Sequence, residues 1–190
     1  MPDVGLDAAH SLLGPRQAFL ITARDPRDGR VNICTAGWVS GANWKPFKVS
    51  VALSKGGLTN ELIRSSGEFV INVPDMDLLD EVVFCGRTSG RKLDKSRRAG
   101  LDLLPSKHVA APYVARALAR VECVVEQALE MDDHWVFVGR AVHAAARDGV
   151  FDGGYAVSRV RPVYQIVGER FCSLDGVEVR REIPVGEGWK

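Results

Sequence analysis

A short run of residues, Ser54-Lys55-Gly56-Gly57-Leu58-Thr59, combines the groups that bind a phosphate. Two glycines let a ligand approach the backbone, and a lysine and two hydroxyls stand beside the predicted start of a helix. Free N–H groups and the dipole at a helix N-terminus favour an anion. The run is equally typical of an ordinary strand-to-helix turn, and Glu61 in the first helical turn satisfies the dipole itself. Both interpretations stay open on this segment alone.

The flanking sequence predicts the elements that hold this run. Apolar and polar residues alternate over Phe47–Ser54, which is the period of a half-buried strand. Apolar residues then recur at helical spacing up to Ser66, and Thr59 is the predicted N-cap. The candidate site is therefore expected between the end of a strand and the start of a helix.

Strands outnumber helices in the rest of the chain. The pattern predicts a hairpin of Gln17–Ala23 and Val31–Gly37 around a turn at residues 25–29, and a helix that Asp75 begins and Gly86 ends. Further strands are expected at Glu68–Val73, Ala119–Leu129, His134–His143 and Val163–Val167. Because helices do not alternate regularly with these strands, we expect a mainly β fold, an antiparallel barrel with a few inserted helices.

Composition narrows the class of protein. The chain has 190 residues, of which 46% are hydrophobic and 26% charged, and its net charge of +1 gives no reason to expect nucleic acid or a membrane surface as a partner. No secretory signal or spanning apolar run is seen. The four cysteines and four histidines form no metal-binding signature, so no metal is expected, and reduced thiols favour a cytoplasmic protein. The sequence also lacks a GxGxxG dinucleotide fingerprint, a Walker A sequence and a GxSxG elbow.

Several segments, taken in order, resemble one known family. They are Val31–Ser40, Ser54-Lys55 with Thr59, Ser66–Pro74, Cys85–Lys95, Ala111-Pro112-Tyr113, Val121-Glu122-Cys123 and Asp133–Gly139. The set resembles the flavin reductase-like, FMN-binding split-barrel proteins, which include flavoredoxins and the reductase components of two-component monooxygenases. The resemblance spans about residues 16–168. The chain departs from the family where Asp132 replaces a frequent glycine and where Thr35-Ala36-Gly37 lacks a frequent proline.

FMN needs a site for its phosphate, polar backbone for one end of its ring and apolar contact for the other. The turn from Ser54 to Thr59 is the expected phosphate site, and the resemblance implies that Lys55 and Thr59 contact the phosphate. The small residues after Ile33 are expected to offer backbone groups to the ring. The expected cofactor-binding residues are Thr35, Ala36, Gly37, Trp38, Ser40, Ser54, Lys55, Thr59, Ser89, Arg91 and Lys95.

The resemblance also implies a reaction. It predicts an oxidoreductase that transfers a hydride from NADH or NADPH to FMN, with His134 positioning the nicotinamide against the flavin and taking no part in proton transfer. The alternative is a flavin-binding electron carrier or flavin store without nicotinamide turnover. The resemblance further implies a homodimer in which the basic loop at residues 87–95 walls the partner's flavin. The electron acceptor, a partner monooxygenase or another species, is left open.

The expected organisation is a lead-in at residues 1–15, a split-barrel domain at residues 16–170 and a C-terminal tail at residues 171–190. FMN is expected in preference to FAD, because the phosphate turn is compact and no dinucleotide fingerprint is present. The choice between NADH and NADPH stays open, although Arg91 or Lys92 are candidates for contact with a 2′-phosphate.

Overall fold

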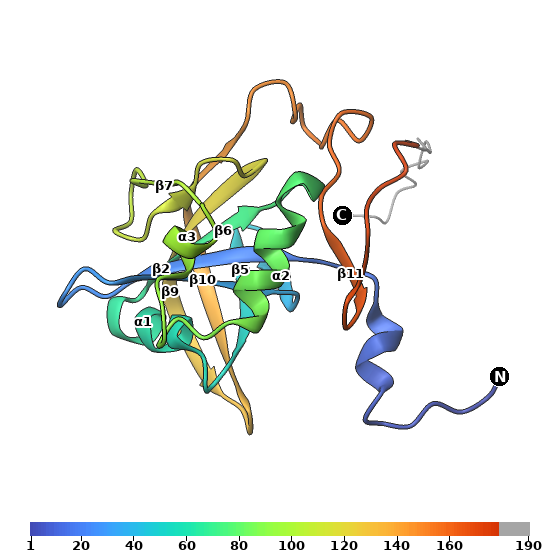
Figure 1. The fold of residues 1–190 in the computed structure, drawn as a ribbon, viewed down its shortest axis with the longest axis horizontal. Helices are drawn as coiled ribbons and strands as arrows, with labels where there is room; N and C mark the ends of the chain where they lie inside the picture. Colours follow the sequence, from blue (N-terminus) through green and yellow to red (C-terminus); the bar gives the residue numbers. More distant parts are fainter. Residues whose placement is uncertain (179–190) are drawn as a thin grey trace.

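The computed structural model of the chain describes residues 1–178 and is built around one seven-stranded antiparallel sheet (Figure 1). The strand order is β3-β2-β6-β9-β10-β5-β4. The sheet curls so that β3, at one edge, approaches β5 near the other edge. Its strands are β2 (Phe19–Arg24), β3 (Val31–Ala36), β4 (Val39–Asn43), β5 (Lys48–Ser54), β6 (Glu68–Val73), β9 (Ala119–Glu130) and β10 (His134–Ala146).

Two small sheets and several short helices complete the described chain. One sheet joins β1 (Arg16–Gln17), β11 (Tyr164–Val167) and β12 (Arg170–Cys172), and the other joins β7 (Leu103–Leu104) and β8 (Tyr113–Val114). The helices are η1 (Ala9–Leu13), α1 (Leu58–Ser66), η2 (Met76–Leu78), α2 (Leu79–Arg87) and α3 (Lys95–Arg98). Within residues 1–178, no helix has the length and apolar character that a membrane span requires.

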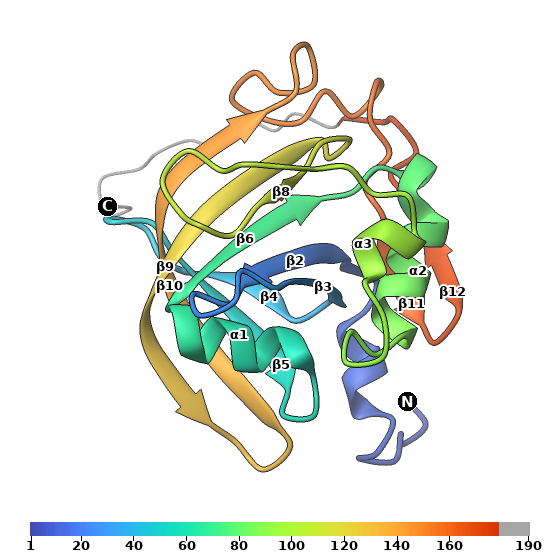
Figure 2. The same cartoon turned by 60° about the vertical axis from the view of Figure 1, so that its left-hand side comes forward.

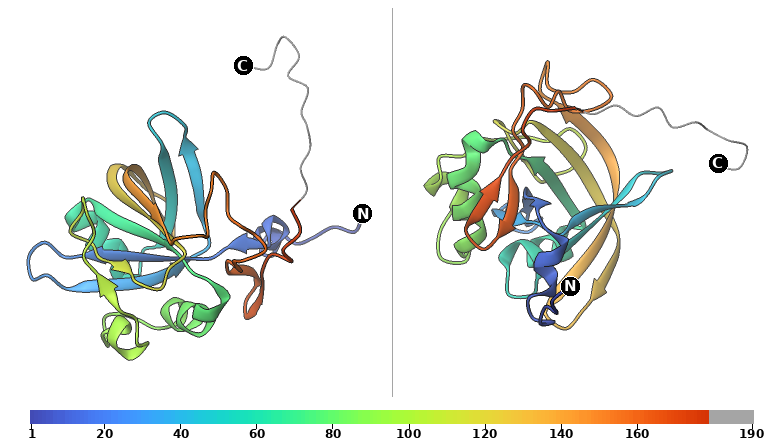
Figure 3. Two further views of the ribbon diagram at one scale, coloured as in Figure 1. Left: turned by 90° about the horizontal axis from the view of Figure 1, so that it is seen from above. Right: turned by 90° about the vertical axis from the view of Figure 1, so that its right-hand side faces the viewer.

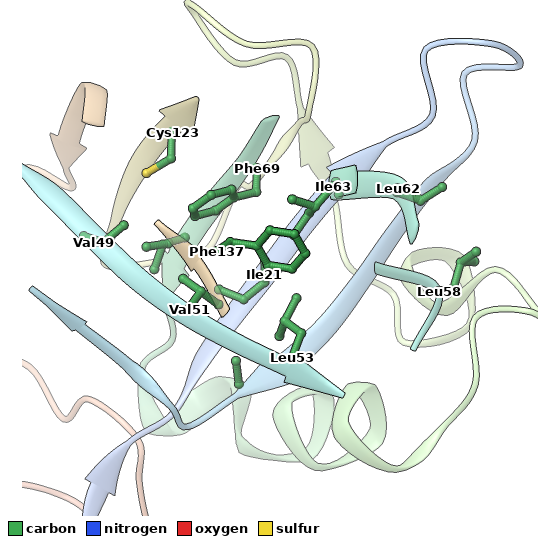
Figure 4. Close-up of a cluster of buried hydrophobic side chains, with 13 residues drawn as sticks. Ile21, Val49, Val51, Leu53, Leu58, Leu62, Ile63, Phe69, Cys123 and Phe137 are labelled. Atoms are coloured by element: carbon green, nitrogen blue, oxygen red, sulfur yellow. The ribbon is translucent and has the colours of Figure 1, made fainter. Parts of the chain in front are cut away.

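The barrel interior is filled by inward-facing side chains of the large sheet (Figure 4). Alternate residues of β5 point inward, and these are Val49, Val51 and Leu53. Phe69 and Phe137 are fully buried among them. Close packing continues to the backbone of β10, where a Cβ atom on Gly139 would lie 2.6 Å from the ring of Phe69. Glycine is therefore required at this position if Phe69 keeps its place.

A second apolar cluster lies on the outer face of the sheet. Leu20 belongs to this outer cluster, whereas its neighbour Ile21 belongs to the barrel interior, so β2 is buried on both faces. Helix α2 covers this face of β3, and a Cβ atom on Gly86 would lie only 3.2 Å from the Cβ atom of Thr35. The helix thus approaches the strand at close range, and Cys85 is buried where they meet.

Helix α1 packs against β2, β3, β5 and β6, where it covers part of the barrel (Figure 2). Its inward face carries Leu58, Leu62 and Ile63, which join the barrel interior. In contrast, the hairpin of β4 and β5 extends away from the body of the molecule (Figure 3). Trp44 near the tip of this hairpin is 83% exposed, and Phe47 is 44% exposed.

The expected mainly β fold with inserted helices is confirmed, and the predicted hairpin forms as β2 and β3. The predicted N-cap of α1 is wrong: Gly57 occupies that position, and the Thr59 side chain turns inward to a hydrogen bond. The predicted stop at Gly86 is also wrong, because α2 continues to Arg87. Asp75 caps a separate 3₁₀ turn, η2. Strand β4 was not predicted, because its small and polar residues are exposed and do not alternate in hydropathy.

Candidate active site

A cavity of about 430 Å³ opens between edge strand β3, the N-terminus of α1 and the C-terminus of α2. Volumes of this size accommodate a small-molecule ligand or cofactor. The strand end at Ala52–Ser54 and the first residue of β10, His134, complete its wall. The cavity therefore lies where the curled sheet is left open between β3 and β5 and is covered by helices on both sides.

One end of the cavity is formed by the turn that leads into α1. The N–H of Gly57 donates to the carbonyl of Ser54 over 3.1 Å, and a Cβ atom on Gly56 would meet nothing within 4 Å. No side chain caps α1, and the first N–H groups of a helix have no partner within it. The turn therefore combines open space with backbone donors, as the sequence pattern predicts for an anion site.

Asn60 fixes this turn and also carries an unused acceptor. Its side-chain NH₂ donates to the carbonyls of Ser54 at 3.3 Å and Lys55 at 3.4 Å. Its Oδ1 atom has no hydrogen-bond partner among residues 1–178, although the residue is only 1% exposed and lines the cavity. A buried polar atom without a partner is costly. A ligand that donates a hydrogen bond, such as one with hydroxyl groups, would satisfy it.

Lys55 lies outside the cavity lining. Its ammonium group forms an ion pair with Glu130 at 2.8 Å, and the two side chains are 33% and 59% exposed. The lysine side chain holds down the pKa of the Glu130 carboxyl through this hydrogen bond. The structure thus brings Ser54 and Thr59 to the cavity but directs Lys55 to the end of β9.

Asn32 and Thr59 join the two sides of the cavity. The side-chain NH₂ of Asn32 donates to the hydroxyl of Thr59 over 2.8 Å, and both residues are buried. Gly90 packs against the same asparagine so closely that a Cβ atom on Gly90 would lie 1.9 Å from Oδ1 of Asn32. Strand β3, helix α1 and the loop after α2 therefore meet at one amide side chain.

A buried lysine also lines the cavity, beside the C-terminus of α2. Lys95 is 4% exposed, and its ammonium group donates to the carbonyl of Cys85 in the last turn of α2 over 2.8 Å. A cation is favourable at a helix C-terminus. Burial lowers the pKa of the Lys95 ammonium, and it raises the pKa of the nearby thiols, that of Cys85 to about 11. Cys34 is the other thiol of this group, and both cysteines line the cavity.

Trp38 and His134 form a pair of rings at the mouth of the cavity. Their ring centroids are 4.8 Å apart, and the planes are tilted by 33°. Nδ1 of His134 lies 2.8 Å from a carboxylate oxygen of Asp133, and this hydrogen bond lowers the pKa of the Asp133 carboxyl. Trp38 remains 46% exposed, so a flat surface is available beside the opening.

The structure gathers most, but not all, of the residues expected from the sequence. Ser40 instead borders a shallow depression on the outside of the β4–β5 hairpin, and Arg91 forms an ion pair with Glu61. Together with Lys55 these two lie outside the cavity. The expected residues that line it are Thr35, Ala36, Gly37, Trp38, Ser54, Thr59, Ser89, Lys95 and His134.

Sequence reasoning missed several residues of the lining. Asn32 was detectable, because it is a polar residue between the apolar Val31 and Ile33 in a strand. Asn60 was also detectable as the neighbour of Thr59 in the first helical turn. No local signal marks Arg16 and Gln165, which come to the cavity through the pairing of β1 with β11.

The fold and the cavity together define a class of protein. The curled antiparallel sheet has a helix-covered opening, and its lining combines a turn suited to an anion, the strand end at Thr35–Gly37 and a buried ammonium group. This arrangement fits a planar cofactor with a phosphate at one end.

The comparisons with known proteins agree with this class. The family model of the flavin reductase like domain matches residues 13–164, so the chain belongs to this flavin-related oxidoreductase family. An uncharacterized protein of Archaeoglobus fulgidus is 37% identical over 161 residues, which cover 85% of this chain and 89% of the relative.

Two solved structures show the same fold. Flavoredoxin from Methanosarcina acetivorans matches with a TM-score of 0.83 and 22% identity, over 99% of this chain and 97% of that chain. An FMN-binding domain of a flavin reductases-like enzyme from Shewanella baltica matches with a TM-score of 0.78 and 26% identity, over 94% and 96% of the two chains.

Proposed function

We propose that this chain binds FMN in the cavity between β3 and α1 and acts as an NAD(P)H-dependent flavin oxidoreductase. The observation that carries the proposal is the unpartnered Oδ1 of Asn60, buried at the cavity wall beside an uncapped helix N-terminus. FMN carries both the hydroxyl groups and the phosphate that these two features require. The FMN-binding relative from Shewanella baltica supports the same cofactor.

The residues present fit the parts of FMN. The backbone of Gly56 and Gly57 and the first turn of α1 would hold the phosphate, with the hydroxyls of Ser54 and Thr59 beside it. Asn60 would accept a hydrogen bond from the sugar-alcohol chain. The backbone between Thr35 and Gly37 would face the ring. These contacts would place the phosphate of FMN at the turn before α1 and its ring beside the end of β3.

Lys95 is proposed to stabilise negative charge at the ring. Its ammonium group is buried and, among residues 1–178, has a carbonyl and no carboxylate as its partner. A buried cation acts strongly on a nearby anion, because little water screens it. When bound, FMN supplies the capacity to accept a hydride from a nicotinamide and to pass electrons onward. Lys95 would make that acceptance more favourable.

Trp38 and His134 are proposed to position the nicotinamide at the cavity mouth. Hydride transfer needs the donor and acceptor atoms held close and aligned, and it needs no protein base. The exposed indole of Trp38 offers a flat surface for this purpose, and the hydrogen bond between His134 and Asp133 fixes the orientation of the imidazole beside it. His134 therefore has a positioning role in this proposal.

Reconstitution and anaerobic reduction test the proposal. The apo protein is titrated with FMN, FAD and riboflavin, and the loaded protein is mixed with NADH or NADPH without oxygen. We expect FMN to bind most tightly and its visible absorbance to bleach with at least one nicotinamide. FMN that binds but is not bleached identifies a flavin-binding electron carrier or store instead. No saturable flavin binding would refute the whole proposal.

We also propose a homodimer. The projecting β4–β5 hairpin exposes Trp44 and Phe47, and large exposed aromatic groups of this kind are typical of protein contacts. The loop at residues 87–95 remains the proposed wall of the partner's flavin site. Sedimentation at micromolar concentration should give twice the chain mass for the wild type and a smaller value for Trp44→Ser.

A further inference from the structure

A second cavity lies beyond Gly90 from the flavin pocket proposed above. It is a groove of about 960 Å³ bordered by the β2–β3 turn, the loop before α3 and the β7–β8 connection. Gly90 lines both this groove and the first cavity, and the neighbours Val31 and Asn32 on β3 line one each. Because successive residues of a strand point to opposite faces, the two sites lie on opposite sides of edge strand β3.

The rim of the groove carries an excess of positive charge. Four cationic residues border it, against the one carboxylate of Asp94, and they are Arg24, Arg30, Arg91 and Lys92. Asp94 is already engaged, since it accepts hydrogen bonds from the hydroxyl of Ser96 and the backbone N–H of Arg97. Its charge is therefore directed at the start of α3.

Most of this positive charge has no acidic partner. Arg91 is neutralised by Glu61, but no ion pair or side-chain hydrogen bond within residues 1–178 involves Arg24 or Lys92. The guanidinium of Arg30 donates to the carbonyl of Gly90 over 2.7 Å and forms no ion pair within residues 1–178, although its charge helps to lower the pKa of the Asp25 and Glu61 carboxyls. Among residues 1–178, three cations of the groove, Arg24, Arg30 and Lys92, thus form no ion pair with a carboxylate.

The groove also has an apolar lining. Val109 is 8% exposed, and prolines and leucines continue the apolar surface beside it, namely Leu93, Leu103, Pro105 and Pro112. An apolar surface beside unmatched cations fits a ligand with a flat, weakly polar body and several negative charges. Inorganic anions would use the rim alone, whereas a nucleotide would use both parts.

We propose that this groove binds the phosphorylated adenosine end of a nicotinamide dinucleotide, with the base on the apolar lining and the 2′-phosphate and diphosphate on Arg24, Arg30 and Lys92. The inference rests on the proposed function, since it assigns the place of the donor's far end and a preference for NADPH over NADH. The shared wall at Gly90 brings a ligand in the groove to the border of the flavin pocket.

Calorimetric titration with fragments of the donor tests the site without any electron transfer. The probes are adenosine 2′,5′-bisphosphate, adenosine 5′-monophosphate, adenosine and inorganic pyrophosphate, each added to the protein with and without FMN. We expect the bisphosphate to bind more tightly than the other three and to weaken as salt is raised. The double variant Arg24→Gln/Lys92→Gln should lose about tenfold to a hundredfold in affinity for it. The matched control Arg170→Gln removes an exposed cation on β12, outside the groove, and should bind as the wild type does.

Three results would overturn the proposal. They are the absence of saturable bisphosphate binding, equal binding of pyrophosphate and bisphosphate, and an unchanged affinity in the double variant. Far-ultraviolet circular dichroism and flavin titration of the variant show whether it folds. If FMN does not bind but the bisphosphate does, the proposed function fails and the nucleotide site stands. If FMN binds and the bisphosphate does not, only the nucleotide site fails.

Discussion

The amide of Asn32 donates its hydrogen to the hydroxyl of Thr59 over 2.8 Å, across the cavity between β3 and α1. Both side chains are almost fully buried. The bond joins the edge strand of the sheet to the helix that carries the proposed phosphate site. It also accounts for the inward turn of Thr59, which was expected to cap the helix.

Thr59→Val keeps the shape of the side chain and removes the acceptor. The NH₂ group of Asn32 then stays buried without its partner, which costs about 1–3 kcal/mol of folding free energy. Urea unfolding of the apo protein measures this loss. Thr59→Ser retains the hydroxyl and is the control, so equal stability losses in both variants would point to packing and not to the hydrogen bond.

Lys55→Ala tests whether the lysine leaves Glu130 to meet the phosphate. Because its ammonium group is engaged at 2.8 Å outside the cavity, we expect FMN affinity to change by less than about threefold. Asn60→Ala, which loosens the turn and removes the buried acceptor, should weaken FMN by about tenfold. A large loss in Lys55→Ala for FMN with none for riboflavin would show that Lys55 moves to the phosphate on binding.

Gly139→Ala should destabilise the fold by about 1–3 kcal/mol, because the added methyl group overpacks the barrel interior. The new Cβ atom would lie 2.6 Å from the ring of Phe69, which is itself fully buried. Thermal and urea unfolding check the change. Gly154→Ala adds a methyl group where nothing lies within 4 Å and serves as the matched control.

Because some thiols are buried, the free energy of unfolding depends on pH in the alkaline range. Burial raises the pKa of Cys123 from 9.0 to about 12. The unfolded thiol therefore ionises first, and the free energy of unfolding falls as pH rises from 9 towards 12. At about pH 10 the ionisation of this thiol in the unfolded chain alone lowers the free energy of unfolding by about 1 kcal/mol.

Cys123→Ala isolates that contribution. Urea unfolding at about pH 8 and pH 10 should show a smaller loss of stability in the variant than in the wild type. The lowered pKa of Lys95 acts in the opposite sense, because the unfolded lysine binds its proton more tightly. A pH dependence identical in wild type and Cys123→Ala would contradict the assignment to this thiol.

The strands with clear alternation were predictable, and so was the cavity turn at residues 54–59, because short-range hydropathy and turn residues carry that information. The position of the Lys55 side chain was not predictable. Its partner Glu130 is distant in sequence and becomes a neighbour only when β10 pairs with β5 on one side and with β9 on the other. Thr59 was misassigned for a related reason. Its local position favours an N-cap, but the hydrogen bond from Asn32, which is distant in sequence, holds the Thr59 side chain inward instead. Arg16 and Gln165 depend on the pairing of β1 with β11, which no local pattern announces.

Strand β3 contributes Val31 to one site and Asn32 to the other. Within residues 1–178 it pairs only with β2, where Val31 lies opposite Arg24 and Asn32 opposite Ala23. A slip of one residue in that pairing would exchange the two faces of the strand. The asparagine would then turn to the cationic groove and the valine to the proposed flavin pocket. One error in the alignment of β3 with β2 would therefore disturb both neighbouring sites. Mutations in the turn at residues 25–30 that shift this alignment should damage both sites together.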